Sequence, residues 1–229
     1  MSALIDTTEM YLKTVFELDE EGITPLRARI AERLAQSGPT VSQTVARMER
    51  DGLLTVEGDR HLEFTTAGRI AAARVMRKHR LVERLLTDVI GLDFELVHEE
   101  ACRWEHVVSE HVERRLVQLL EHPTESPYGN PIPSLDELGE RSATEGFREG
   151  LRGLDTAADA VSPVDVAVRR ICEPLQTDVA TLADLRRVGA LPGHTVRANG
   201  HDKGVQITGA GGSSAVLSTE LAGHVLVRG

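Results

Sequence analysis

Residues 37–50, SGPTVSQTVARMER, carry the signals of an amphipathic helix together with its start. Ser37-Gly38-Pro39 forms a turn, and proline is well suited to the first helical position. Val41, Val45 and Met48 recur at the spacing of one helical face. The opposite face holds polar side chains, namely Thr40, Ser42, Gln43, Arg47 and Arg50. We therefore predict a helix that stops at Asp51-Gly52 and exposes its polar face.

Two further helices are predicted before this stretch and a hairpin after it. Asp6 and Glu9 have the spacing of a helix cap, and an apolar stripe of helical spacing follows them. A second, shorter stripe precedes Ser37. Two short alternating runs, residues 53–56 and 61–64, flank the turn residues 57–60. Three helices followed by a hairpin predict a winged helix-turn-helix.

The rest of the chain divides into helical, irregular and β-rich parts. Residues 66–90 and 94–120 have long helical patterns. Residues 123–150 are rich in proline and glycine, which predicts an extended, polyproline-like segment and a linker. Beyond Ser162, short β-branched runs predict a small, separate β-rich barrel. These runs are residues 164–171, 196–198, 205–207, 215–217 and 224–227.

Length and composition indicate an ordinary soluble globular protein. The 229 residues are 41% apolar and 27% charged, and roughly 100–200 residues per domain suggests one large domain or two to three small ones. No apolar run is long enough to span a bilayer, and Met1–Asp6 lacks the basic and apolar regions of a secretory signal. Cys102 and Cys172 do not make a disulfide framework, which fits a reducing cytoplasm. These observations exclude membrane proteins, secreted mini-domains and fibrous proteins.

Charge is distributed unevenly along the chain, although the formal net charge is −10. Residues 24–80 contain eleven Lys/Arg and six Asp/Glu, whereas residues 81–145 contain five and fifteen, with four of the nine histidines. A locally basic stretch suits a phosphate-binding surface, and a His-rich acidic stretch suits a divalent cation. Chance patchiness on solvated faces is the alternative.

The polar face of the helix predicted after Ser37 has the side chains that DNA recognition needs. Gln43 can hydrogen-bond a base edge, and Arg47 and Arg50 suit phosphates. Further phosphate contacts are expected from Arg27, Arg29 and Arg60. The alternative is an exposed helix without DNA contacts, because some winged-helix domains bind only proteins.

Potential metal ligands are concentrated on the two long helical patterns. Residues four apart lie on one face of a helix. The first pattern holds His79 and Glu83 at this spacing, and the second holds His98, Cys102 and His106, with Glu105 beside them. Imidazole, thiolate and carboxylate together describe a mixed site for a divalent transition metal. The alternative is an ordinary helix surface with one small buried cysteine.

Two enzymatic interpretations compete with simple metal binding. A His/Glu metal site could activate water, and Cys102 with His106 could form a nucleophile and its base. The sequence has no His-Glu-x-x-His helix, no Gly-rich phosphate loop and no Ser-based nucleophile elbow. No third group that would orient His106 is evident. We therefore expect no enzymatic activity.

Long runs of residues 4–140 resemble the iron-dependent repressors of the diphtheria-toxin-repressor type (DtxR/IdeR) found in actinobacteria. The last third of the chain matches this family only loosely. The runs that carry the resemblance are residues 6–12 (DTTEMYL), 25–34 (PLRARIAERL), 37–52, 75–81 (VMRKHRL), 99–106 (EEACRWEH) and 129–133 (GNPIP).

The resemblance implies three domains: a winged helix-turn-helix in residues 1–73, a helical dimerisation and metal-binding domain in 74–140 and, after a linker at 141–150, an SH3-like barrel in 151–229. Residues 127–133 are then expected to dock on the SH3-like domain, since such folds bind extended proline-rich chains.

The resemblance also implies two metal sites in each subunit and a set of DNA contacts. The regulatory site would use Met10, Cys102, Glu105 and His106. The ancillary site would use His79, Glu83 and His98, completed by Glu173 and Gln176. Ser37, Pro39 and Gln43 would face bases, and the residues near the DNA backbone would be Arg27, Ala28, Thr40, Ser42, Arg47, Arg50 and Arg60.

The function implied is a cytoplasmic, Fe²⁺-activated, homodimeric repressor that binds palindromic operator DNA, with two dimers on each operator. Met10 and Cys102 suit a borderline-soft ion such as Fe²⁺, and iron selectivity over Zn²⁺ or Ni²⁺ would have to come from metal availability. Co²⁺, Ni²⁺, Mn²⁺ and Zn²⁺ are expected to substitute in vitro. The alternatives are a manganese-responsive regulator of the same architecture and a metal-binding or hydrolytic protein without DNA function.

Overall fold

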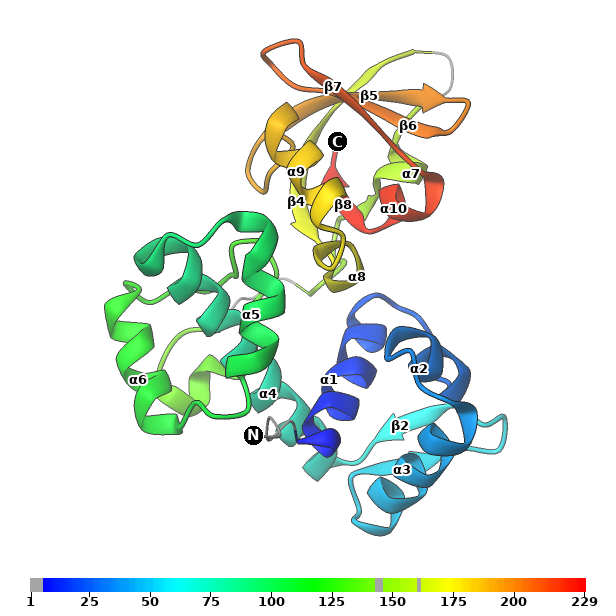
Figure 1. The fold of residues 1–229 in the computed structure, drawn as a ribbon, viewed down its shortest axis with the longest axis vertical. Helices are drawn as coiled ribbons and strands as arrows, with labels where there is room; N and C mark the ends of the chain where they lie inside the picture. Colours follow the sequence, from blue (N-terminus) through cyan, green and yellow to red (C-terminus); the bar gives the residue numbers. More distant parts are fainter. Residues whose placement is uncertain (1–5, 143–145, 160–161) are drawn as a thin grey trace.

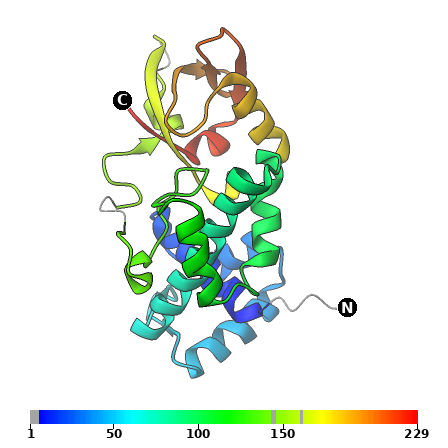
Figure 2. The same ribbon diagram turned by 90° about the vertical axis from the view of Figure 1, so that its left-hand side faces the viewer.

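The computed structural model describes residues 6–142, 146–159 and 162–229, which form three lobes (Figure 1). The N-terminal and C-terminal lobes lie at opposite ends of the long axis, and a helical lobe lies at their side (Figure 2). No helix in these ranges is both long and apolar enough to cross a membrane. Residues 1–5, in the stretch considered for a secretory signal, and residues 143–145 of the expected linker lie outside the described residues.

The N-terminal lobe is a winged helix-turn-helix, as the sequence predicts. Its elements are α1 (Thr7–Glu20), α2 (Arg27–Arg33), α3 (Gly38–Arg50), β1 (Leu54–Val56) and β2 (Leu62–Phe64). Asp6 begins α1 by accepting hydrogen bonds from the backbone N–H groups of Thr8 and Glu9, and Ser37 begins α3 by accepting one from Thr40. All five elements contribute to one core, which includes Tyr11, Ile30, Val45, Met48, Leu54 and Leu62.

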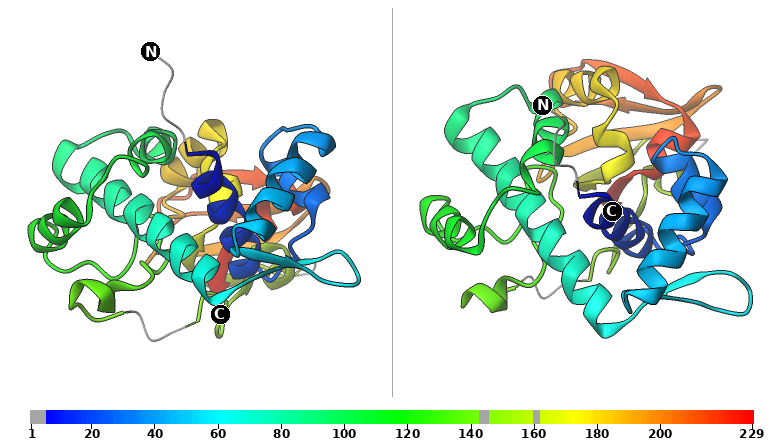
Figure 3. Two further views of the ribbon diagram at one scale, coloured as in Figure 1. Left: turned by 90° about the horizontal axis from the view of Figure 1, so that it is seen from below. Right: turned by 60° about the horizontal axis from the view of Figure 1, so that its bottom comes forward.

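Helix α4 (Thr66–Leu85) connects the N-terminal lobe to the rest of the molecule. Its first half packs in the N-terminal core through Ala72 and Met76. Its second half contributes Leu81 to the core of the helical lobe and Val82 to the core shared with the C-terminal lobe. Figure 3 shows α4 crossing the molecule beside α1. One π-helical turn, η1 (Leu86–Ile90), continues the predicted helix to Gly91.

The single helix predicted over residues 94–120 is wrong. The chain forms a 3-10 turn, η2 (Phe94–Leu96), and then two helices, α5 (Val97–Trp104) and α6 (Glu110–Leu119). Ser109 starts α6 by accepting a hydrogen bond from the backbone N–H of Val112. The break places Glu105 and His106 at the end of α5 rather than in the middle of a helix.

Residues 123–142 fold back on themselves, so the predicted polyproline-like extension is wrong. The backbone N–H of Ile132 donates to the carbonyl oxygen of Thr124, and that of Ser126 donates to Asn130, both at 2.8 Å. Gly129 permits the turn because its φ is +78°. A 3-10 turn, η3 (Leu135–Leu138), follows.

The tip of this loop packs on strand β4 (Val164–Ile171) of the C-terminal lobe. The backbone N–H of Ile171 donates to the carbonyl oxygen of Tyr128 at 2.9 Å, and Asn130 Nδ2 donates to the carbonyl oxygen of Ile171 at 3.0 Å. Tyr128 is fully buried in the shared core. The expected contact between residues 127–133 and the C-terminal lobe is therefore confirmed, but it is made by a tight turn rather than by an extended proline-rich chain.

The C-terminal lobe is β-rich, as predicted, and its described residues also contain short helices that the sequence reasoning missed. Six strands pair in antiparallel fashion in the order β3-β8-β4-β5-β6-β7 within the described part of this lobe. The other strands are β3 (Arg152–Gly153), β5 (Thr195–His201), β6 (Gly204–Thr208), β7 (Ser214–Leu217) and β8 (Val225–Arg228). The helices are α7 (Leu154–Ala157), α8 (Glu173–Gln176), α9 (Val179–Val188) and α10 (Thr219–Gly223).

The contact between the loop and β4 predicts a specific cost at Gly129. A Cβ at this position would lie 2.0 Å from the carbonyl oxygen of Arg169, in addition to the strain of a left-handed backbone. We expect Gly129→Ala to lower the free energy of unfolding by about 2–5 kcal/mol in urea denaturation. Gly193→Ala is the matched control, because Gly193 also has a positive φ but open space around its Cβ position. The control is expected to cost only about 1–2 kcal/mol, and equal losses in the two variants would contradict the close approach.

Candidate nucleic-acid interface and metal centre

Helix α3 has the two faces that its sequence predicts. Val41, Val45 and Met48 are fully buried in the N-terminal core. The residues proposed to meet DNA from this helix and its cap are all exposed: Ser37, Pro39, Thr40, Ser42, Gln43, Arg47 and Arg50. The polar face is therefore available to a partner outside the chain.

The hairpin after α3 is fastened to the segment that precedes α2. His61 forms a β-bridge with Leu26, and the backbone N–H of Leu62 donates to the carbonyl oxygen of Pro25 at 2.8 Å. Arg60 is exposed at the hairpin turn with a φ of +72°, and Ala28 is exposed on α2 while Arg27 is partly covered. The wing and the start of α2 are thus held together.

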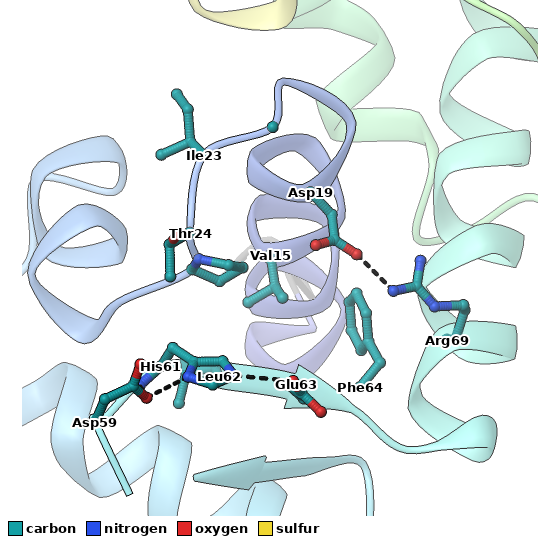
Figure 4. Close-up of a pocket in the computed structure, with 12 residues that line it drawn as sticks. Val15, Asp19, Ile23, Thr24, Asp59, His61, Leu62, Glu63, Phe64 and Arg69 are labelled. Atoms are coloured by element: carbon teal, nitrogen blue, oxygen red, sulfur yellow. Dashed lines mark hydrogen bonds and ion pairs between the residues drawn. The ribbon is translucent and has the colours of Figure 1, made fainter. Parts of the chain in front are cut away.

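A cavity of about 520 Å³ lies between α1, the loop before α2 and the wing strand β2 (Figure 4). Figure 4 shows His61 between the carboxylates of Asp59 and Glu63, and Asp19 paired with Arg69. Each carboxylate that lines the cavity therefore faces a basic side chain.

The hydrogen bonds of His61 change its acidity. The carboxylate of Glu63, 2.9 Å from Nε2, and that of Asp59 both favour the imidazolium, so the pKa of His61 is raised above its ordinary value. The bond to His61 in turn lowers the pKa of Asp59. The wing therefore carries a small charge cluster that is complete only while His61 is protonated.

The predicted metal ligands come together where α1, α4 and α5 meet. A second cavity, of about 620 Å³, lies at this junction and reaches the C-terminal lobe. The predicted ligands that line it are Met10, His98, Cys102, Glu105, His106 and Glu173. Because these residues come from every lobe, all three lobes meet at this cavity around potential metal donors.

Three of the predicted ancillary ligands form a buried group. His79 Nε2 lies 2.8 Å from Glu83 Oε1 and 3.2 Å from His98 Nδ1. Glu83 Oε2 is buried and has no hydrogen-bond partner in the described part of the chain. A buried carboxylate oxygen without a partner next to two imidazoles is the arrangement that a cation would complete.

The predicted regulatory ligands lie beside this group. His106 Nδ1 is 2.7 Å from Glu9 Oε2 on α1, which leaves Nε2 directed to Glu105, 3.5 Å from its Oε1. Cys102 is partly exposed toward the cavity. A carboxylate that binds one ring nitrogen fixes the orientation of the other, as around metal-bound histidines.

The two predicted ligand sets adjoin each other in this structure. His79 Nδ1 lies 2.6 Å from Glu105 Oε2, so the two ring nitrogens of His79 face different sets. Cys102 Sγ lies 3.6 Å from His98 Nε2. Donor atoms of His79, His98 and Cys102 fall within 4.8 Å of one another, so this group follows the mixed site predicted from the residue types and crosses the division into two sites that the resemblance implies.

Lys13 belongs to this cluster and was missed from the sequence. Its Nζ lies 3.1 Å from each of three atoms, Cys102 Sγ, Glu105 Oε2 and His79 Nδ1. A lysine on an amphipathic helix is usually solvated, so neither its type nor its position signalled burial.

The charges in the cluster stabilise one another at neutral pH. Burial disfavours ionisation of Cys102, but Lys13 and His98 outweigh burial and hold the pKa of the thiol well below its ordinary value. Burial likewise disfavours the charged forms of Glu105 and His98, but the neighbouring charges have the larger effect. Lys13 lowers the pKa of Glu105 to about 2, and the Cys102 thiolate raises the pKa of His98 to about 9. The sulfur and carboxylate donors are thus already deprotonated, as metal binding requires, whereas the His98 imidazolium would have to release its proton to become a ligand.

The two predicted ligands from α8 are placed differently from each other. Glu173 lines the cavity, and its Oε1 accepts hydrogen bonds from Arg80 at 2.6 Å and Asn130 at 3.2 Å. Gln176 is buried, and its Nε2 donates to the carbonyl oxygen of Ile171 at 2.7 Å. Glu173 Oε2 and Gln176 Oε1 have no hydrogen-bond partner in the described ranges. Both residues therefore keep a buried oxygen that a cation could use.

Comparison with known proteins identifies the family of the chain. Residues 3–62 match the family described as iron dependent repressor, N-terminal DNA binding domain, and residues 65–134 match iron dependent repressor, metal binding and dimerisation domain. The chain is 58% identical over 217 residues to the iron-dependent repressor IdeR of Mycobacterium tuberculosis, covering 95% of this chain and 91% of the relative. It is 54% identical over 227 residues to the diphtheria toxin repressor of Corynebacterium glutamicum, covering 99% and 98%. The chain belongs to the iron-dependent repressor family.

This repressor therefore has a DNA-binding domain and a metal-binding and dimerisation domain, and it is a regulator rather than an enzyme. Its fold is shared with a solved structure described as a manganese-dependent transcriptional repressor complex with manganese. That similarity has a TM-score of 0.80 at 26% identity and covers 97% of this chain and 99% of the other. The family excludes the hydrolytic alternative that the sequence left open.

The charge cluster on the wing of the repressor predicts a measurable titration. Because the pKa of His61 is raised, its ion pairs stabilise the wing fully below pH 6.5, and this contribution is lost as the pH rises through the raised value. In an NMR titration of the His61 ring, we expect a midpoint above 6.5 and a lower midpoint in Glu63→Gln. Glu57→Gln is the control, since Glu57 is on the same wing and forms no ion pair with His61 in the described structure. Equal midpoints in all three proteins would show that the Glu63 contact is not formed.

Proposed function

We propose that the repressor is activated by Fe²⁺ and binds palindromic operator DNA as a homodimer. The observation that supports this most strongly is the double role of α1. This helix contributes Tyr11 and Val15 to the winged-helix core and, on another face, brings Met10 and Lys13 to the predicted metal ligands of α5. A change in the metal cluster therefore acts directly on an element of the DNA-binding lobe.

The residues present fit two metal sites in each subunit. Met10, Cys102, Glu105 and His106 would hold the regulatory ion. His79, Glu83 and His98, with Glu173 and Gln176, would hold the ancillary ion. The partnerless buried oxygens of Glu83, Glu173 and Gln176 support the second assignment, and the ionised thiol and carboxylate support the first.

A bound divalent cation supplies two positive charges and directional bonds to these side chains. Cys102 and Glu105 on the α5 segment and Met10 on α1 would then share one partner, and α1 would be fixed relative to α5. Glu9 would hold His106 in its ligating orientation through the Nδ1 hydrogen bond. Activation follows because the placement of α1 that satisfies these ligands is favoured over others, which is a differential affinity between two states.

Iron is favoured over manganese by the donor types. A thioether and a thiolate suit a borderline-soft ion, whereas Mn²⁺ prefers oxygen and nitrogen. A manganese-responsive regulator of the same architecture is the second candidate, favoured by the solved structure described as a manganese-dependent repressor. Co²⁺, Ni²⁺, Mn²⁺ and Zn²⁺ are expected to occupy the sites in vitro.

The remaining assignments concern DNA, assembly and location. Ser37, Pro39 and Gln43 would face bases, and backbone contacts would come from Arg27, Ala28, Thr40, Ser42, Arg47, Arg50 and Arg60. We propose two dimers on each operator, a cytoplasmic location and a division into residues 1–73, 74–140 and 151–229, joined by 141–150. The SH3-like domain then contributes Glu173 and Gln176 to the ancillary site.

The regulatory site should control activation and the ancillary site should support it. Cys102 is the only cysteine of the cluster, and Met10 is the only predicted ligand on α1, so Cys102→Ala and Met10→Ala should lose metal-dependent operator binding but remain folded dimers. His79→Ala should only raise the Fe²⁺ concentration required, since the Met10 link survives. Anaerobic operator-binding titrations against free Fe²⁺ measure all three variants. Loss of activation in His79→Ala together with a wild-type response in Met10→Ala would reverse this hierarchy.

The DNA assignments predict that replacing Gln43 and replacing Arg47, four residues apart on α3, change DNA binding in different ways. Gln43→Ala should relax sequence preference by about 1–3 kcal/mol at one base position, because a base-edge hydrogen bond is lost. Arg47→Ala should weaken binding to all sequences alike and flatten its salt dependence, because a phosphate contact is lost. Binding of both variants to operator and random duplexes over a salt series tests this. If both changes have the same effect on specific and random DNA, Gln43 is not a base reader.

A comparison of metals separates the two candidate functions. Operator binding by gel shift with Fe²⁺, Mn²⁺, Co²⁺ or Zn²⁺ under anaerobic conditions should give activation by Fe²⁺ at a lower free concentration than by Mn²⁺. The reverse order would favour the manganese-responsive regulator. Binding that does not depend on any of these metals would overturn the proposal.

A further inference from the structure

Lys13 occupies the centre of the predicted regulatory site. Its side chain is only 7% exposed, and its ammonium lies 3.1 Å from both Cys102 Sγ and Glu105 Oε2. Glu17, one turn further along α1, adds a weaker contact at 4.0 Å. The ammonium thus contacts two of the side chains that are proposed to ligate the regulatory ion.

The contacts of Lys13 join one cation, its ammonium, to two anionic groups, the thiolate of Cys102 and the carboxylate of Glu105. A buried ammonium is stable only with acceptors for its protons, and the thiolate and carboxylate are the strongest acceptors nearby. The same two groups, without a cation between them, would be two buried anions that repel each other. The ammonium of Lys13 therefore neutralises the negative charges of Cys102 and Glu105, as a bound metal ion would.

The position of Lys13 along α1 places it close to Met10, the other α1 side chain of the predicted regulatory site. Lys13 follows Met10 by three residues, so both side chains project from neighbouring positions of one helix face. The ammonium and a divalent cation cannot share Cys102 and Glu105 at close range, because like charges repel. Entry of the ion would thus exchange one α1 side chain, Lys13, for another, Met10.

We propose that Lys13 is an internal counter-cation of the regulatory site. In the metal-free repressor it binds Cys102 and Glu105, and it leaves when the activating ion binds. It therefore sets the metal concentration at which the repressor responds and ties α1 to α5 until that point. This inference rests on the proposed function, because it takes Cys102 and Glu105 as metal ligands.

The test measures metal binding directly, with Co²⁺ as the probe. Full-length metal-free repressor, wild type or Lys13→Met, is titrated anaerobically with Co²⁺, and the thiolate-to-cobalt absorption band is followed. We expect Lys13→Met to bind Co²⁺ at least tenfold more tightly, which corresponds to about 1.4 kcal/mol. We also expect the metal-free variant to unfold at a lower temperature than wild type, because Cys102 and Glu105 lose their cation.

Two control variants isolate the role of this ammonium. Lys203→Met removes an equal charge from the turn between β5 and β6, where Lys203 is exposed and contacts neither Cys102 nor Glu105 in the described structure. Its Co²⁺ affinity should change less than twofold. Lys13→Arg keeps the charge and should stay close to wild type.

Each outcome decides the matter. Equal or weaker Co²⁺ binding by Lys13→Met, while wild type shows the thiolate band, overturns the role of Lys13 and leaves the proposed function intact. Absence of the thiolate band in wild type overturns the regulatory site itself, and the inference with it. If metal-free Lys13→Met is unfolded but folds on addition of Co²⁺, the counter-cation role is supported. If it does not fold in either condition, Lys13→Gln takes its place with the same expected results.

Discussion

The buried guanidinium of Arg80 joins the three lobes and so helps to fix the elements that carry the predicted metal ligands. Arg80 is inaccessible to solvent and donates to Glu20 on α1 at 2.5–2.9 Å, to Glu173 on α8 at 2.6 Å and to the carbonyl oxygen of Pro131. Removal of one partner from a buried ion pair typically costs about 3–5 kcal/mol, because the remaining charge stays buried. His79 directly precedes Arg80 on α4, so this network also fixes the position from which His79 faces Glu83 and Glu105.

Helix α1 connects the cluster of predicted metal ligands to the DNA-binding lobe. One side of α1 packs with α2 and α3 in the winged-helix core, and the helix also lies beside α4 (Figure 3). Met10 and Lys13 line the cavity that holds the predicted metal ligands. The helix has little freedom to respond by bending, because Tyr11 and Val15 are almost completely buried. A rigid helix transmits a change at Met10 or Lys13 as a shift of the whole lobe, since packed cores do not deform continuously.

Features that depend on local residue spacing could be predicted from the sequence. Features that depend on packing between segments distant along the chain could not. The winged helix-turn-helix followed from capping residues and apolar periodicity, and the ligand types on α4 and α5 followed from their four-residue spacing. Periodicity could not detect the break at residues 105–109, because the apolar spacing continues across it, although Ser109 is a good helix cap. The short helices α8 and α10 have too few residues for a periodic signal. Met10 came only from family resemblance, and Lys13 from neither source, because its partners lie 66–92 residues away along the chain.

The presence of Lys13 in the predicted regulatory site affects how metal binding could select one placement of α1 over another. A ligand shifts an equilibrium only by its difference in affinity for the two states. If Met10 were the sole link between α1 and the cluster, that difference would rest on one weak thioether bond. With Lys13 as the counter-cation, metal binding both removes an ionic attraction between α1 and α5 and adds a ligand bond one turn away on the same helix. The two placements of α1 are then each stabilised by a cation shared with Cys102 and Glu105, an ammonium in one and a metal ion in the other. Because the two cations exclude each other, the free metal concentration decides between the two placements.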